Sequence, residues 1–243
     1  KLLKNQGTKV VLNKDLIVPE YNLRDNTKSL TNSLFNKPLQ FRLIKDIEDP
    51  AYNQVFFMPI IEFNNIYDGI VLGVKAYNKT VLKKPFYYKI APQYGTKSKS
   101  LTGSITLNYN QYIQNTSDLF SINYGISASY ASYAEDLFVR KLTPGISMQF
   151  RDKTNLRSNK KQFITLRYVD INRDDNPVVT ADATQPNYSV LNARYNNINK
   201  GLKDYTAWFT DLQFGKKFGK LAFNFEYRKL TEGNRQINLR LFT

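Results

Sequence analysis

The segment from Phe120 to Tyr130 reads Phe-Ser-Ile-Asn-Tyr-Gly-Ile-Ser-Ala-Ser-Tyr, and its residues alternate between two chemical classes. Every even position is apolar or aromatic, and every odd position is small or polar. Side chains along a β-strand point to opposite faces in turn, so a strand here has one apolar side and one polar side. Strands in soluble sheets average about 5–6 residues, whereas a tilted strand needs about 9–11 residues to cross a bilayer. The segment therefore indicates a membrane-spanning strand.

The same alternation recurs from residue 39 to the last residue, Thr243. Turn signals such as Asp68-Gly69 separate the alternating runs. About eleven or twelve strands are predicted, at 39–45, 52–66, 70–77, 86–94, 101–110, 120–130, 138–151, 162–171, 188–196, 205–214, 221–230 and 235–242. Long amphipathic strands joined by turns are typical of outer-membrane barrels. We therefore expect an all-β fold, a transmembrane antiparallel β-barrel that belongs to a larger barrel, because the alternation still continues at Thr243.

The apolar positions of these strands are the ones that we expect to contact lipid. The mean hydropathy of −0.48 and the hydrophobic content of 42% agree with this reading, because only half of each spanning strand faces lipid. A register error of one residue would move a strand's whole set to the opposite face. The predicted lipid-facing residues are Ile105, Leu107, Ile122, Tyr124, Ile126, Ile146, Met148, Phe223, Phe225, Ile237 and Leu239.

The sequence contains no cysteine and no histidine. Disulfides and thiolate chemistry are therefore excluded from this segment. The absence of histidine excludes an HExxH zinc site, a Ser-His-Asp triad and an imidazole base. We expect no catalytic residue, no cofactor and no metal ligand in this segment.

The net charge is +15, and its distribution bears on the partners. A nucleic-acid reader is expected to gather basic residues on one helix or stripe. Here they are scattered and concentrate only at expected turns, as at Lys83-Lys84 and Lys216-Lys217. We therefore expect contacts with membrane lipids and lipopolysaccharide, with other outer-membrane or secretion-complex subunits as further partners, and no nucleic acid.

The chain divides at about residue 38. Residues 1–38 are polar and poor in strand patterns, which predicts a linker or lead-in from an upstream module, whereas residues 39–243 hold the barrel. The connections are of two kinds, tight turns and two long polar loops at 151–161 and 172–187. Short turns on one side and long loops on the other are typical of outer-membrane barrels.

Two acidic groups are the candidate polar sites. Asp170, Asp174 and Asp175, with Asn172 and Asn176, form an oxygen-rich cluster without the spacing of an EF-hand loop, and a solvated loop is the preferred interpretation. A second group, Asp46, Glu48 and Asp49, could serve acid–base chemistry, but we expect no basic or nucleophilic partner to be set nearby.

The stretch 39–104 resembles a known family. The matching elements are the acidic turn Asp46-Ile47-Glu48-Asp49-Pro50, the segment Asn65-Ile66-Tyr67-Asp68-Gly69, and Tyr94-Gly95-Thr96-Lys97-Ser98-Lys99. They are similar to the C-terminal outer-membrane β-barrel region of Bacteroidetes proteins of the aminopeptidase-N-like zinc metallopeptidase family, the HExxH gluzincins. The resemblance implies a bacterial outer-membrane location and an upstream peptidase module that binds zinc. Because no HExxH motif exists here, its zinc ligands and catalytic glutamate have no counterpart in this segment.

Three functions follow from the sequence. The first is a barrel domain that anchors a peptidase-like module. The second is a transport pore or a structural subunit of an outer-membrane secretion or insertion complex. The third is a soluble, basic β-sandwich that binds glycans or nucleic acid.

Overall fold

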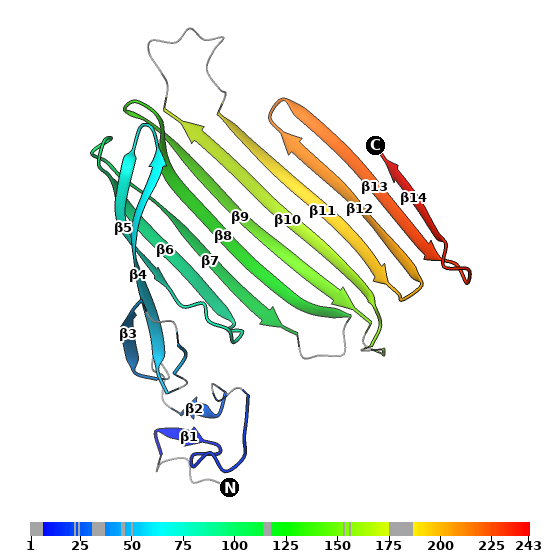
Figure 1. Cartoon of the computed structure of the whole chain (residues 1–243), viewed down its shortest axis with the longest axis horizontal. Helices are drawn as coiled ribbons and strands as arrows, with labels where there is room; N and C mark the ends of the chain where they lie inside the picture. The colour runs from blue at the N-terminus through cyan, green and yellow to red at the C-terminus, as the bar shows by residue number, and fades with distance from the viewer. Residues whose placement is uncertain are drawn as a thin grey trace.

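The computed structural model describes residues 7–21, 23, 25–30, 37–44, 47–49, 51–113, 118–152, 154–155, 157–174 and 187–243. These residues form strands, turns and irregular segments (Figure 1). β1 (Lys9–Val11) and β2 (Thr27–Ser29) pair as a small sheet of their own, and the large sheet begins at Leu39. No helix in the described part of the chain is long and apolar enough to cross a membrane.

The large sheet contains twelve strands, each paired with its neighbours along the chain. The all-β prediction is confirmed, and each predicted run coincides with a strand whose ends differ by a few residues. The strands are β3 (Leu39–Leu43), β4 (Asn53–Asn65), β5 (Gly69–Tyr77), β6 (Phe86–Gly95), β7 (Leu101–Tyr112), β8 (Leu119–Ala134), β9 (Leu137–Arg151), β10 (Lys160–Arg173), β11 (Tyr188–Lys200), β12 (Asp204–Gly215), β13 (Phe218–Leu230) and β14 (Gln236–Phe242).

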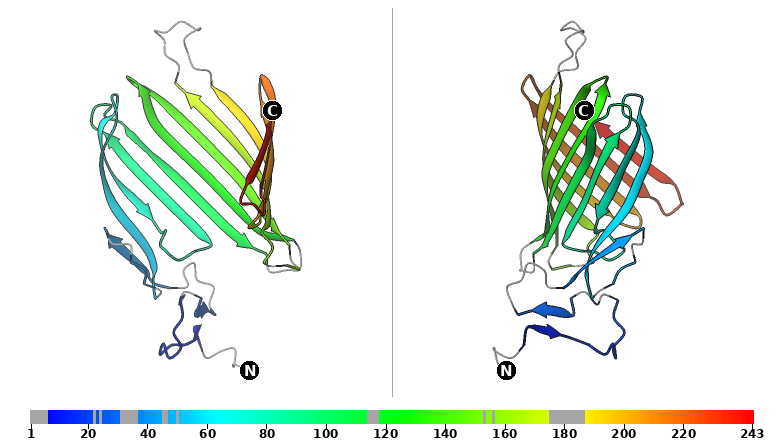
Figure 2. Two further views of the ribbon diagram at one scale, coloured as in Figure 1. Left: turned by 45° about the vertical axis from the view of Figure 1, so that its right-hand side comes forward. Right: turned by 90° about the vertical axis from the view of Figure 1, so that its left-hand side faces the viewer.

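The sheet is curved but open. In Figure 2 its two sides turn out of the plane of the middle strands, and β3 and β14 form the two edges. Among the described residues β3 pairs only with β4, and β14 pairs only with β13. The structure thus contains a large, mostly antiparallel sheet that does not close on itself.

The first strand departs from the predicted antiparallel order. β3 runs parallel to β4, with Phe41 opposite Val55. The connection between them is fixed by Gln54, which is 4% exposed. Its side-chain oxygen accepts a hydrogen bond from the Asp49 backbone N–H at 2.8 Å, and its amide donates to Gln40 Oε1 at 2.8 Å. These contacts hold the connection so that β4 begins beside the start of β3, which makes the two strands parallel. The alternation of apolar and polar residues in the sequence does not predict these contacts.

The strands are long enough to cross a bilayer. β7 to β13 contain 12 to 16 residues each, and they run diagonally across the sheet (Figure 1). At about 3.3 Å per residue, a 13-residue strand is about 43 Å long. A tilt of about 45° reduces its height to about 30 Å, the thickness of a typical hydrocarbon core.

The two long connections lie at opposite ends of the sheet. β10 is antiparallel to both of its neighbours, β9 and β11. The connection that follows β9 and the connection that follows β10 therefore lie at opposite ends of the strands. The prediction that short turns gather at one end and long loops at the other is therefore wrong. Residues 175–186 of the longer connection lie outside the described residues.

Candidate functional site

One face of the large sheet carries apolar side chains along its whole width. Residues directly opposite each other on paired strands point to the same face, so the register can be followed from strand to strand. Leu107 pairs with Ile126, and Ile122 pairs with Met148. This apolar face contains Ile61, Leu72, Ile90, Leu107, Ile126, Ile146, Leu166, Leu191, Leu212, Phe225 and Leu239, with the residues two positions away on each strand.

The register places all the residues predicted to face lipid on this one face. Ile105, Leu107, Ile122, Tyr124, Ile126, Ile146, Met148, Phe223, Phe225, Ile237 and Leu239 are connected through direct cross-strand partners. None of these side chains is buried. Ile126 is 40% exposed at the centre of the sheet, and Ile61 near one edge is 76% exposed. Soluble monomers rarely expose contiguous apolar patches larger than a few hundred Å². An apolar face of this width is therefore expected to be covered by another apolar surface rather than by water.

Charged side chains are divided unequally between the two faces of the twelve strands. On the apolar face they are confined to positions within four residues of a strand end, namely Arg140, Lys160, Asp170, Asp204 and Lys229. The opposite face, called the polar face here, carries Arg42, Lys75, Lys89, Lys141, Arg151, Lys161, Arg167, Arg173, Arg194, Lys200, Lys220, Arg228 and Arg240. Its only carboxylates within the strands are Glu62, Asp211 and Glu226. The polar face is therefore strongly basic.

Side chains crowd together on the polar face. Val71, Ala91, Thr102 and Val139 are buried there, and Asn65 at the end of β4 donates a hydrogen bond to the Ser132 backbone oxygen of β8 at 3.2 Å, past the three strands that lie between them in the sheet. Crowding of this kind is expected on the inner side of a curved sheet, where neighbouring side chains converge. The apolar face is therefore the outer surface of the curve, and the polar face lines its interior.

Asp211 is the centre of the best-ordered polar group on this face. Its side chain is 3% exposed, and its carboxylate accepts three side-chain hydrogen bonds. Arg194 Nε donates to Asp211 Oδ2 at 2.6 Å, and Asn192 and Gln213 donate to Asp211 Oδ1 at 2.8 and 2.9 Å. A buried carboxylate needs such partners. This network ties β11 to β12 on the polar face.

Arginine side chains on the polar face lie over aromatic rings. The guanidinium of Arg228 is 4.3 Å from the ring centroid of Tyr205, and that of Arg194 is 4.7 Å from the ring of Phe209. Stacking on an aromatic face restrains the planar guanidinium and adds a cation–π attraction. These arginines are therefore held in fixed orientations above the sheet.

The turn between β4 and β5 contains a second buried carboxylate. Asp68 is inaccessible to solvent, and its Oδ2 accepts hydrogen bonds from the side-chain amides of Asn64 and Asn65 at 2.9 and 3.0 Å. Burial alone raises the pKa of Asp68, but hydrogen bonds to the carboxylate, including those from Asn65 and Asn64, outweigh burial and hold the pKa below its usual value. Asp68 is thus an ionised structural residue of this turn.

The two acidic groups singled out from the sequence have local structural contacts. Asp174 Oδ2 accepts a hydrogen bond from the Phe138 backbone N–H at 2.9 Å, while Asp170 lies on the apolar face. Asp175 and Asn176 lie outside the described residues. Asp46 also lies outside them, but Glu48 Oε1 is 3.8 Å from Lys84 Nζ, and Asp49 Oδ2 is 3.6 Å from Arg42. The prediction that this second group lacks basic partners is therefore wrong.

Sequence reasoning identified the apolar face and missed the organisation of the polar one. The basic residues alternate with the apolar ones, and that periodicity could have placed them together. The Asn192–Arg194–Asp211 contacts depend on the pairing of β11 with β12, which alternation does not specify.

The arrangement offers a broad apolar surface on one side and a basic, arginine-rich surface on the other. Within the described residues no group of three or more acidic side chains is placed to hold a metal ion. No family model, no curated protein and no solved structure matches this chain.

Proposed function

We propose that residues 39–243 form part of the wall of an outer-membrane β-barrel, with the apolar face toward lipid and the polar face toward an aqueous interior. The separation of charge between the two faces carries this proposal. Between the strand ends, the apolar face of the twelve strands holds no charged side chain, while the polar face carries thirteen basic side chains and three carboxylates within the strands. Lipid excludes charge from its core, and an aqueous interior accepts it.

The open edges of the sheet set a condition on this proposal. In hydrocarbon, every unpaired backbone N–H and C=O costs several kcal/mol, so membrane sheets close. In a bilayer the outer edges of β3 and β14 therefore require further strands. The barrel we propose consists of this sheet completed at both edges, in agreement with the expectation of a larger barrel.

The role of such a wall is to hold an attached module at the membrane or to enclose a pore. The basic interior favours keeping the pore as the second candidate. The zinc peptidase module implied by the family resemblance stays a prediction, since it concerns residues upstream of this segment. A β-sandwich requires a second sheet over the apolar face, and the described residues form only the short β1–β2 sheet in addition.

Vesicle flotation tests the proposal. The chain is refolded into phosphatidylcholine vesicles, washed with alkaline carbonate and centrifuged through a density gradient. We expect the protein to float with the vesicles after the wash and to aggregate in detergent-free buffer. A chain that stays monodisperse without detergent and remains at the bottom of the gradient contradicts the proposal.

A further inference from the structure

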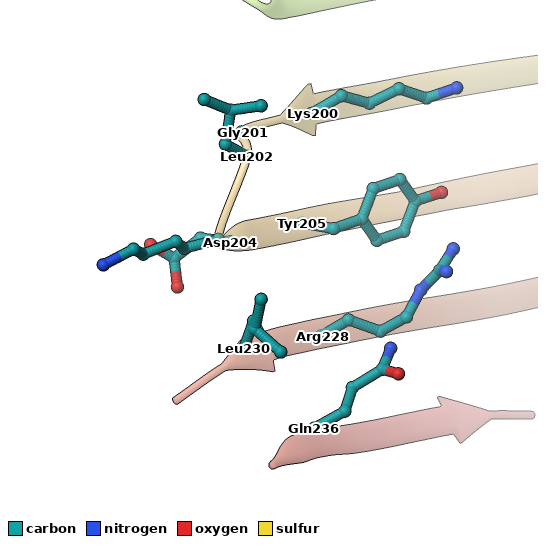
Figure 3. A pocket seen from close by; sticks show the side chains of 9 residues that line it. Lys200, Gly201, Leu202, Asp204, Tyr205, Arg228, Leu230 and Gln236 are labelled. Carbon is teal, nitrogen blue, oxygen red and sulfur yellow. The ribbon is translucent and has the colours of Figure 1, made fainter. Parts of the chain in front are cut away.

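A pocket opens on the polar face where β11, β12 and β13 meet (Figure 3). Lys200 pairs with Tyr205 across β11 and β12, and Tyr205 pairs with Arg228 across β12 and β13. These three residues therefore stand in one row on the same face. In Figure 3 their side chains extend in one direction, while Asp204 points the other way. The lining is completed by Gly201, Leu202, Lys203, Leu230 and Gln236.

Arg228 is held in place by two contacts. Its guanidinium lies 4.3 Å from the centroid of the Tyr205 ring, and its Nε is 3.0 Å from Glu226 Oε1. The Glu226 carboxylate contacts Arg228 through Nε. This contact does not use the two terminal nitrogens of the guanidinium, which can donate to an oxyanion in a bidentate manner. The Arg228 side chain is 44% exposed and remains accessible from the pocket.

The surroundings of the pocket favour a negative ligand. The one carboxylate of the lining, Asp204, belongs to the apolar side of its strand. On the polar face of β13, Glu226 forms an ion pair with Arg228 through Nε at 3.0 Å. Lys200 and Lys203 bring further positive charge to the rim. Three basic side chains, Lys200, Lys203 and Arg228, thus face one carboxylate in the lining, and an excess of one sign of charge in a cleft concentrates counter-ions.

We propose that this pocket binds the phosphate group of a soluble anion, with Arg228 as the oriented donor and Lys200 as the second positive charge. The planar guanidinium suits the geometry of phosphate oxygens, and the lysine ammonium adds a mobile point charge. Phosphate also occurs in lipid headgroups. The pocket lies on the face opposite the lipid-facing one, which favours a solute from the aqueous interior. The inference rests on the proposed function only for that choice of source.

Titration of the detergent-solubilised chain with inorganic pyrophosphate tests the binding. We expect R228Q and K200Q each to weaken pyrophosphate binding at least tenfold. The matched control is K229Q, which removes the same charge from the neighbouring position on the apolar face, and it is expected to change the affinity less than twofold. Circular dichroism of each variant checks that the sheet is intact. The absence of binding by the unmodified chain, or equal weakening by all three substitutions, overturns the proposal.

A second arm separates the two sources of phosphate. Vesicles of phosphatidylcholine alone and vesicles containing phosphatidylglycerol are compared for the unmodified chain and R228Q. We expect R228Q to bind both vesicle types as the unmodified chain does. Selective loss of affinity for phosphatidylglycerol vesicles overturns the assignment to a solute. The pyrophosphate titration needs no bilayer, so a failure of flotation and a failure of anion binding are distinguishable.

Discussion

Replacement of Ile126 by lysine tests the lipid contact of the apolar face at its centre. Ile126 lies in the middle of the 16-residue strand β8, between Leu107 and Pro144 on the neighbouring strands. It is 40% exposed, so a longer side chain has room to leave the sheet. In a bilayer this room is hydrocarbon, where a lysine near the midplane of a barrel strand costs about 2–4 kcal/mol. The folding equilibrium should then shift by about 30- to 700-fold.

Ser127 provides the matched control, because it is the next residue on the same strand and faces the polar side. It is also exposed, and S127K introduces the same charge. We expect S127K to change the free energy of unfolding by no more than about 0.5 kcal/mol, as for other exposed positions. The assay is equilibrium urea unfolding of each variant in phosphatidylcholine vesicles, followed by tryptophan fluorescence of Trp208. Equal effects of I126K and S127K, or a larger effect of S127K, refute the reasoning.

Three further substitutions address the stability of the sheet. In G103A, the new Cβ would lie 2.3 Å from the Ala91 carbonyl oxygen, at a residue whose φ is +144°. We expect this substitution to lower the free energy of unfolding by more than about 1 kcal/mol. G219A, whose Cβ would meet only ordinary van der Waals contact, is the control in the same urea titration. Because the pKa of Asp68 is lowered in the folded state, its ionised carboxylate stabilises the turn above about pH 4 and loses this effect as the pH falls through the folded-state pKa. The free energy of unfolding, measured from pH 6 to pH 2, should therefore decrease more for the unmodified chain than for D68N. Parallel pH curves for the two proteins would contradict this expectation. D211N should lower the free energy of unfolding by about 1–3 kcal/mol, because a buried carboxylate that accepts three hydrogen bonds is replaced by a weaker acceptor. An unchanged midpoint of urea unfolding would argue against a stabilising role of this network.

The sequence predicted most strands of the sheet because each carries its own alternation. Phe120 to Tyr130 identifies β8 without reference to any other residue, and the short turn at Glu135-Asp136 makes β8 and β9 antiparallel neighbours. The face of each predicted lipid-contacting residue is a consequence of the same local period.

Features that depend on contacts between distant residues were not predictable in this way. The parallel pairing of β3 depends on Gln54 contacting Gln40, and the Lys84–Glu48 pair joins residues on either side of two strands. Alternation assigns a residue to a face but does not specify its neighbours.

In the proposed barrel wall, β8 separates lipid from water along its length. The chain contains no cysteine, so single cysteines placed in turn from Ile122 to Tyr130 each give one spin-label site in protein reconstituted into vesicles. Collision rates with oxygen, which concentrates in lipid, and with a water-soluble nickel chelate are then measured by electron paramagnetic resonance. We predict a two-residue alternation, with oxygen favoured at Ile122, Tyr124 and Ile126 and the nickel chelate favoured at the residues between them. Equal access of the nickel chelate to both sets of positions would contradict the account.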